Sequence, residues 1–173
     1  SRRAWMDVRG AEHRGVNEAE VRAMRATLRE FLDWAEASGP PRGRKSGVWE
    51  VACLCFYLRQ EEALSWMVQD LLDSDARHCF QFPSEQHPLV DIRCGTVDRF
   101  QGREADLVLL SMRNTRRVGF LDSPNRLKVA VTRARQQLVI FGDYGFFRDD
   151  ERVAAELREL AKMTRVVKGD TPR

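Results

Sequence analysis

The sequence has no long apolar run. No stretch of the 173 residues approaches the roughly 18–20 consecutive apolar residues that a membrane-spanning helix requires, so we predict no membrane partner. The opening segment, SRRAWMDVRG, also lacks the apolar stretch of a signal peptide. We therefore expect an intracellular protein, cytoplasmic or, in a eukaryote, nuclear.

Cysteine is scarce and is not spaced for a metal or a redox pair, because the four cysteines include no C-x-x-C. His78, Cys79 and His87 lie near one another in the sequence. Structural zinc sites usually use closely spaced pairs of ligands, so we predict no metal site. Cys53 and Cys55 fall on one face of an apolar segment, which is typical of buried, reduced thiols.

A phosphate-binding loop is also missing. The segment GPPRGRKSG (39–47) is rich in glycine, but Gly39 and Gly43 are too close for the pattern G-x-x-x-x-G-K-[ST], and an arginine precedes Lys45. The expected order here is helix, loop, strand, whereas a phosphate loop leads from a strand into a helix. We interpret the segment as a solvated connection, so this sequence lacks its own triphosphate cradle.

The composition is that of a globular domain. Hydrophobic residues make up 43% and charged residues 32% of a chain that is long enough for one domain with a substantial core. The net charge of +3 is too small to indicate nucleic-acid binding by itself.

Hydrophobic periodicity predicts strands that alternate with helices. Apolar residues recur at helical spacing across residues 16–38, with Asn17 as the expected N-cap and Glu20 at the capping-box position. The expected strands are continuously apolar, as in a parallel sheet covered on both faces, so we predict a single α/β domain of this kind. Strands are expected at 2–10, 48–57, 90–97, 106–112 and 137–143, helices at 16–38, 58–73, 123–136 and 148–163, and an irregular insertion at about 74–90.

Polar residues interrupt the apolar pattern in GTVDRFQGREADLVLL (95–110). Residues 96–98 end an expected strand, and ligands of open parallel sheets bind at the carboxyl ends of strands. Gly102 would let the backbone approach another group closely, and Gln101 and Glu104 can hydrogen-bond hydroxyls, bases or water. The alternative is a polar connecting turn in which Gly102 is needed only for its dihedral angles.

The expected helix at 123–136 carries several basic residues. Ser123 is a suitable N-cap. At about 100° per residue, Arg126 and Arg133 fall on one flank of the apolar stripe, and Lys128 and Arg135 on the other. Arg133 and Arg135 therefore cannot share one partner. Both could be snorkelling or ion-paired arginines, or one could be a phosphate ligand.

Two long segments resemble helicase motifs. TVDRFQGREADLVLLSMR resembles motif V, and NRLKVAVTRARQQLVIFGD resembles motif VI, of superfamily 1 helicases of the up-frameshift-like branch. GVNEAEV resembles the Asn-Glu segment of that branch. LCFYLRQ resembles its TPYxxQ segment and keeps Tyr57 and Gln60, with Phe56 in place of proline. The resemblance covers roughly residues 3–145.

The resemblance implies a RecA-like fold and a function. Residues 1–147 would form the second RecA-like domain of an ATP-driven motor, with residues 148–173 as a closing helix and tail. The N-terminal RecA-like domain of the same protein would carry Walker A and Walker B and bind most of the ATP and its Mg²⁺. Single-stranded DNA or RNA would be the other partner. Alone, this chain would be inactive.

The resemblance also assigns roles to individual residues. Arg133 would be the catalytic arginine finger that reaches the γ-phosphate, and Arg135 a structural or coupling residue. The remaining roles are nucleotide binding by Gln101, Gly102 and Glu104 and nucleic-acid contact by Thr96, Val97, Tyr57 and Gln60.

Two other functions are weighed against the motor. One is a non-catalytic helicase-like module for nucleic-acid binding or docking, which would not need to keep Arg133, Gly102 and Glu104. The other is a nucleotide-binding metabolic domain, which is weakest because no G-x-G-x-x-G follows the first expected strand. The sequence does not distinguish DNA from RNA.

Overall fold

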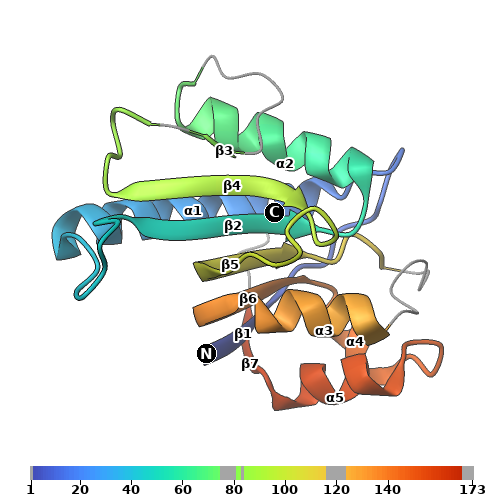
Figure 1. Cartoon of the computed structure of the whole chain (residues 1–173). Coiled ribbons are helices and arrows are strands. Elements are labelled where there is room, and N and C mark those ends of the chain that lie inside the picture. The colour runs from blue at the N-terminus through green and yellow to red at the C-terminus, as the bar shows by residue number, and fades with distance from the viewer. Residues whose placement is uncertain (1, 75–80, 83, 116–123, 169–173) are drawn as a thin grey trace.

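The fold is built on one seven-stranded sheet, with strand order β3-β4-β2-β5-β6-β1-β7 (Figure 1). The structure, a computed structural model, describes all residues except 1, 75–80, 83, 116–123 and 169–173. Its strands are β1 (Arg2–Asp7), β2 (Trp49–Cys55), β3 (Gln81–Phe82), β4 (Val90–Thr96), β5 (Ala105–Ser111), β6 (Ala134–Gly142) and β7 (Arg165–Lys168). Its helices are α1 (Glu18–Ser38), α2 (Leu58–Leu71), α3 (Pro124–Thr132), α4 (Tyr144–Asp149) and α5 (Ala155–Met163).

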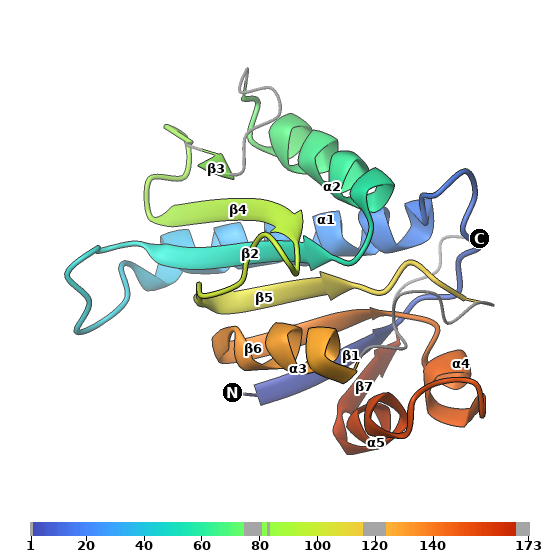
Figure 2. The ribbon, with the colours of Figure 1, turned by 45° about the vertical axis from the view of Figure 1, so that its right-hand side comes forward.

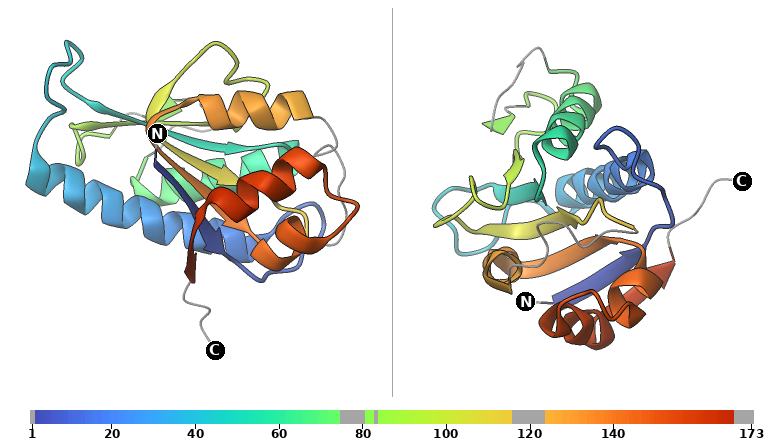
Figure 3. Two further views of the ribbon diagram at one scale, coloured as in Figure 1. Left: turned by 90° about the horizontal axis from the view of Figure 1, so that it is seen from below. Right: turned by 90° about the vertical axis from the view of Figure 1, so that its right-hand side faces the viewer.

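Helices cover both faces of this sheet. All strand pairs are parallel except the short β3–β4 pair. Figure 3 shows α1 and α2 on one side of the sheet and α3 on the other. Two hydrophobic clusters fill the layers, one beneath α1 and α2 and one shared by α3 and α5. The predicted mostly parallel α/β fold with helices on both faces is therefore confirmed.

The central strand β5 is buried along its whole length because it is covered on both faces. All seven residues of β5 are buried, which explains the continuous apolar run in the sequence. Cys53 and Cys55 lie in β2 with their side chains in the cluster beneath α1 and α2. Burial raises the pKa of both thiols above the ordinary value, so they stay protonated at neutral pH. Cys79 lies outside the described residues.

Several element boundaries differ from the prediction. The helix expected at 123–136 ends at Thr132, because the chain then enters β6 and the Arg133 carbonyl accepts a hydrogen bond from the backbone of Ala105. The expected N-cap, Ser123, lies outside the described residues. The helix expected at 148–163 is divided, since the Asp143 side chain caps an earlier short helix, α4. The expected tail contains β7, whose four residues are too few for a periodic signal.

The start of α1 is tied to the end of β5 by a buried carboxylate. Asn17 caps the helix through the backbone N–H of Glu20, as predicted. The Glu20 carboxylate accepts hydrogen bonds from Ser111 Oγ at 2.5 Å and from the Arg113 backbone N–H at 2.8 Å. Burial raises the pKa of Glu20 to about 8, although these hydrogen bonds oppose the shift. The folded protein therefore holds a proton on Glu20 at neutral pH.

We expect the free energy of unfolding to fall as the pH rises from about 5 to 8. The folded state keeps the Glu20 proton in this range, whereas the unfolded state loses it near the ordinary glutamate pKa, so each pH unit costs up to about 1.4 kcal/mol. Urea unfolding of the wild type and of Glu20→Gln across this range measures the effect, and the variant should lose the slope. Glu36→Gln, an exposed position on α1, should keep it. Parallel pH profiles for wild type and Glu20→Gln would contradict the assignment.

Candidate functional site

The polar turn at 97–104 passes over one face of the sheet, from the carboxyl ends of the strands (the carboxyl edge) to their amino ends (the amino edge). It follows the last residue of β4, Thr96, and leads into the first residue of β5, Ala105. Both strands run parallel to β2, which lies between them. Figure 2 shows the turn leaving the arrowhead of β4 and passing to the opposite end of β5. The expectation that the whole turn lies at the carboxyl edge is therefore wrong. Only its first residues do, and Gly102 and Glu104 lie at the amino edge.

The middle of the turn is fixed by its own backbone and by one aromatic ring. The backbone N–H of Phe100 donates to the Thr96 carbonyl at 3.1 Å, and that of Arg103 donates to the Phe100 carbonyl at 3.1 Å. The Phe100 side chain is fully buried in the cluster beneath α3. Gly102 has φ +79°, which favours glycine, and nothing lies within 4 Å of the position that a Cβ would take. The turn is a rigid bridge with an open side at Gly102.

Arg133 lies at the same amino edge, at the junction of α3 and β6. Its Nε donates to the Val129 carbonyl at 3.0 Å, and its Nη1 donates to the Arg103 carbonyl at 3.2 Å. Its Nη2 donates to Thr132 Oγ1 at 3.1 Å. The guanidinium is partly exposed and is aimed at the turn, neither buried in the core nor directed away.

The charge of Arg133 is not neutralised. Within the described parts of the chain, no carboxylate lies within ion-pair distance of its guanidinium, which donates to carbonyl and hydroxyl oxygens. Gln101 and Glu104 beside it are exposed. The structure thus brings Arg133, Gly102 and Glu104 to one edge, where an unpaired cation faces solvent beside an open backbone.

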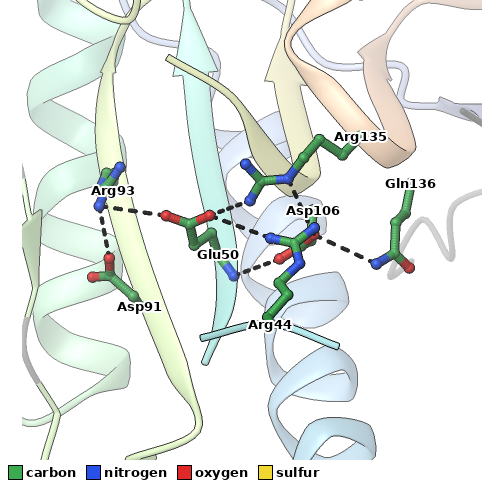
Figure 4. A network of polar contacts seen from close by, with 7 residues as sticks. All are labelled: Arg44, Glu50, Asp91, Arg93, Asp106, Arg135 and Gln136. Carbon is green, nitrogen blue, oxygen red and sulfur yellow. Dashed lines mark hydrogen bonds and ion pairs between the residues drawn. The ribbon is translucent and has the colours of Figure 1, made fainter. Parts of the chain in front are cut away.

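Arg135, two residues further on, is by contrast fully paired. It lies on β6 and not on the far flank of a helix, and its guanidinium binds Glu50 and, at 3.3 Å, Asp106 (Figure 4). Partial burial works to lower the pKa of Arg135, but hydrogen bonds to Glu50 and Asp106 outweigh it and raise the pKa above its ordinary value. The two arginines of TRAR therefore differ, because Arg135 is ion-paired whereas Arg133, among the described residues, is hydrogen-bonded only to uncharged oxygens.

Asp106 is the centre of this amino-edge network, and the sequence did not reveal it. Its side chain is 2% exposed, and its Oδ2 accepts from the Glu50 backbone N–H at 3.0 Å. Arg44 also reaches Asp106, from the loop that we interpreted as only a solvated connection. A carboxylate inside a buried strand requires cations, so Asp106 itself was the available signal. Figure 4 shows the remaining members: Gln136 donates to Asp106, and Arg93 pairs with Glu50 and with Asp91.

The residues proposed to contact nucleic acid lie together at the carboxyl edge, but they are buried. The Gln60 amide is used internally, since its Nε2 donates to Ser111 Oγ at 2.9 Å and its Oε1 accepts from the Asn17 backbone. Tyr57 is buried beneath the Arg113 guanidinium, which lies 3.4 Å from the ring centroid. Thr96 and Val97 are also buried, although Thr96 Oγ1 accepts from the Arg99 backbone. These side chains can shape this edge from within, and they offer little surface to a ligand.

Comparison with known proteins identifies the family. The AAA_12 family, described as an AAA domain, matches residues 4–145. The chain belongs to this family. The matched range includes the turn at 97–104, Arg133 and most of the sheet, so the candidate site lies within the part of the chain that matches the family.

Similar proteins include several ATP-dependent helicases. An uncharacterized ATP-dependent helicase of Methanocaldococcus jannaschii is 40% identical over 78 residues, which are 45% of this chain and 12% of that protein. The "Helicase required for RNAi-mediated heterochromatin assembly 1" of Schizosaccharomyces pombe is 37% identical over 97 residues, 54% of this chain and 8% of that protein. A "Regulator of nonsense transcripts 1 homolog" of Arabidopsis thaliana is 46% identical over 56 residues, 31% of this chain and 4% of that protein.

The resemblance drawn from motifs V and VI is confirmed. This chain is a helicase-like AAA_12 domain of the superfamily 1, up-frameshift-like type, homologous to the C-terminal part of ATP-dependent helicases. It spans no more than 12% of the length of the relatives named above. Among the described residues, every helix is too short or too polar to cross a membrane.

We expect Asp106→Asn to destabilise the domain strongly. The substitution keeps the size of the side chain but removes the buried charge that Arg44 and Arg135 share, so that only the Glu50 carboxylate remains to pair with them, and we expect a cost of about 1–3 kcal/mol. Urea unfolding measures the loss. Asp70→Asn, which breaks the exposed 2.7 Å pair with Arg25, should change stability by less than about 1 kcal/mol. Equal small effects of the two substitutions would show that the network does not hold the edge.

Proposed function

We propose that this chain is the C-terminal motor domain of an ATP-dependent DNA or RNA helicase or translocase, in which it completes the ATP site with Arg133. The observation that carries the proposal is the contrast between two neighbouring arginines. Arg135 is neutralised by Glu50 and Asp106, whereas Arg133 faces solvent without a carboxylate partner among the described residues. An arginine held in that state beside an open glycine suits an anionic ligand.

The amino-edge residues fit a triphosphate. Bound ATP with Mg²⁺, held mainly by the N-terminal RecA-like domain of the same protein, supplies a γ-phosphate with negative charge. Arg133 offers Nη donors toward it, and Gly102 lets the backbone approach without steric hindrance. Glu104 and Gln101 are exposed beside them and can accept from ribose hydroxyls.

The placement of Arg133 on a separate domain gives a switch. The guanidinium binds phosphate only when the two domains close, so phosphate charge favours the closed state. A ligand shifts a conformational equilibrium only through such differential contacts. Loss of the γ-phosphate removes the contact and permits opening. The exposed side chain of Arg133 is compatible with engagement and release, because its existing hydrogen bonds leave it at the surface.

The turn at 97–104 would connect the two ligands of the motor. Single-stranded nucleic acid is proposed to lie along the carboxyl edge near Thr96, and the nucleotide lies at the amino edge near Gly102. Phe100 anchors the turn between them, and its backbone hydrogen bonds join the two ends into one continuous segment. Phosphate contacts would dominate affinity for the strand, so binding should weaken as salt rises. Buried Tyr57, Gln60 and Val97 would support this edge from inside.

We expect Arg133→Ala, in a protein that also contains the first RecA-like domain, to lower nucleic-acid-stimulated ATP hydrolysis by about 10³-fold or more. Arg133→Lys should remain impaired, because an ammonium cannot present a planar fork. Steady-state phosphate release measures the rate, and fluorescence anisotropy with a labelled single strand measures binding, which should change little in both variants. Equal loss of hydrolysis and binding would indicate a folding role. Unchanged hydrolysis would favour the non-catalytic module.

We expect the 173-residue chain by itself to show no ATP hydrolysis above background, because its sequence contains no Walker A loop. A phosphate-release assay on the purified chain, with and without single-stranded DNA or RNA, tests this. Turnover that disappears in the Arg133→Ala variant of the same chain would overturn the division of the site between two domains.

A further inference from the structure

A hollow, called the slot below, opens near the amino edge, on the opposite face of the sheet from α3. Its volume is about 570 Å³, within the range of small-molecule sites. It lies between the later half of α1 and the sheet. Its roof is Thr27, Glu30, Phe31 and Trp34 of α1, and its floor includes Asp106, Leu107 and Gln137 of the sheet.

One wall of this slot is aromatic. The ring centroids of Phe31 and Trp34 lie 5.3 Å apart, and those of Trp34 and Trp49 lie 5.1 Å apart. Trp49 is fixed, because its Nε1 donates to the Gly39 carbonyl at 2.9 Å. Trp34 remains 48% exposed, which is unusual for a tryptophan already packed against two rings. The wall therefore offers a positioned indole surface to a flat partner.

The opposite side of the slot is polar, because β6 begins there with exposed glutamines. Gln137 pairs in register with Leu107 and precedes Val139 by two positions on β6, so all three point to the face covered by α1. Its neighbours Leu107 and Val139 on that face are core residues, whereas Gln137 is exposed at the start of the strand, and among the described residues no protein group hydrogen-bonds its amide. Arg2, in register with Gln137, and Glu30 on α1 are exposed beside it.

We propose that this slot binds a nucleobase. A planar heterocycle would stack on Trp34, its edge would exchange hydrogen bonds with the Gln137 amide and the Glu30 carboxylate, and Arg2 would lie near its phosphate. An amide provides donors and an acceptor together, which matches the mixed edge of a base. Stacking supplies affinity for any base. A purely apolar ligand would displace water from the exposed side chains of Gln137 and Glu30 without replacing its hydrogen bonds.

The slot is separate from the edge proposed for the γ-phosphate. Arg133 contacts α3 and does not line the slot, which is roofed by α1, although Asp106 of the ion-pair network is one of the residues that line it. The inference therefore does not rest on the proposed motor function. The base could belong to a free nucleotide or to a single strand, and the two sources differ in size and in salt dependence.

The test uses mononucleotides and a strand as probes. Isothermal titration of the 173-residue chain with AMP, GMP, CMP and UMP, and with a mixed-sequence single-stranded 12-mer, gives the affinities. Two-dimensional NMR of the indole and side-chain amide N–H groups locates the site. We expect shifts of the Trp34 indole and the Gln137 amide signals. Trp34→Ala should weaken binding by about 10-fold or more, as expected for loss of base stacking.

Two matched variants keep the proposal falsifiable. Gln137→Leu preserves the packing volume and should weaken binding while the chain stays folded. Trp66→Ala removes an equally exposed tryptophan from α2 and should leave binding unchanged. Mononucleotide binding that depends on Trp34 supports a free-nucleotide site, and Trp34-dependent binding of the 12-mer alone supports a strand site. No binding of either probe, or binding that is insensitive to both Trp34→Ala and Gln137→Leu, would overturn the proposal.

Discussion

A single buried carboxylate organises the edge on which the proposed chemistry depends. Asp106 lies inside the central strand β5, where a negative charge is tolerated only with cations close by. Arg135 and Arg44 supply them from β6 and from the loop before β2. These contacts hold the first residues of β2, β5 and β6 together. Because Arg135 is held by this pairing, the backbone of Arg133 two residues earlier has a defined position.

The crossing turn gives this edge its relation to the rest of the domain. Its ends lie at opposite edges of the sheet, and Phe100 holds its middle in the core. Under the proposed function, residues close in sequence would therefore contact two ligands, one at each end of the strands. The buried Glu20 network stiffens the carboxyl edge in the same way that Asp106 stiffens the amino edge.

Much of the fold could be predicted from the sequence, because continuous apolar strands and the amphipathic α1 leave strong periodic signals. The end of α3 could not, since TRAR is equally compatible with helix and only the pairing of Arg133 with Ala105 ends it. For the same reason Arg135 was placed on a helix flank. The candidate residues were found through motifs, but the edge at which they lie depends on strand order. The burial of Gln60 and Val97, and the partners of Asp106, are contacts between distant segments that no local pattern encodes.

The backbone conformation at Gly102 is one that a d-residue adopts more easily than an l-residue. Its φ of +79° is disfavoured for residues of the natural chirality, whereas the space at its Cβ position is empty. Bulk is therefore not what restricts this position. A d-alanine incorporated by chemical ligation would keep the backbone geometry that an l-alanine strains, so the mirror-image residue separates conformational demand from the need for a bare backbone.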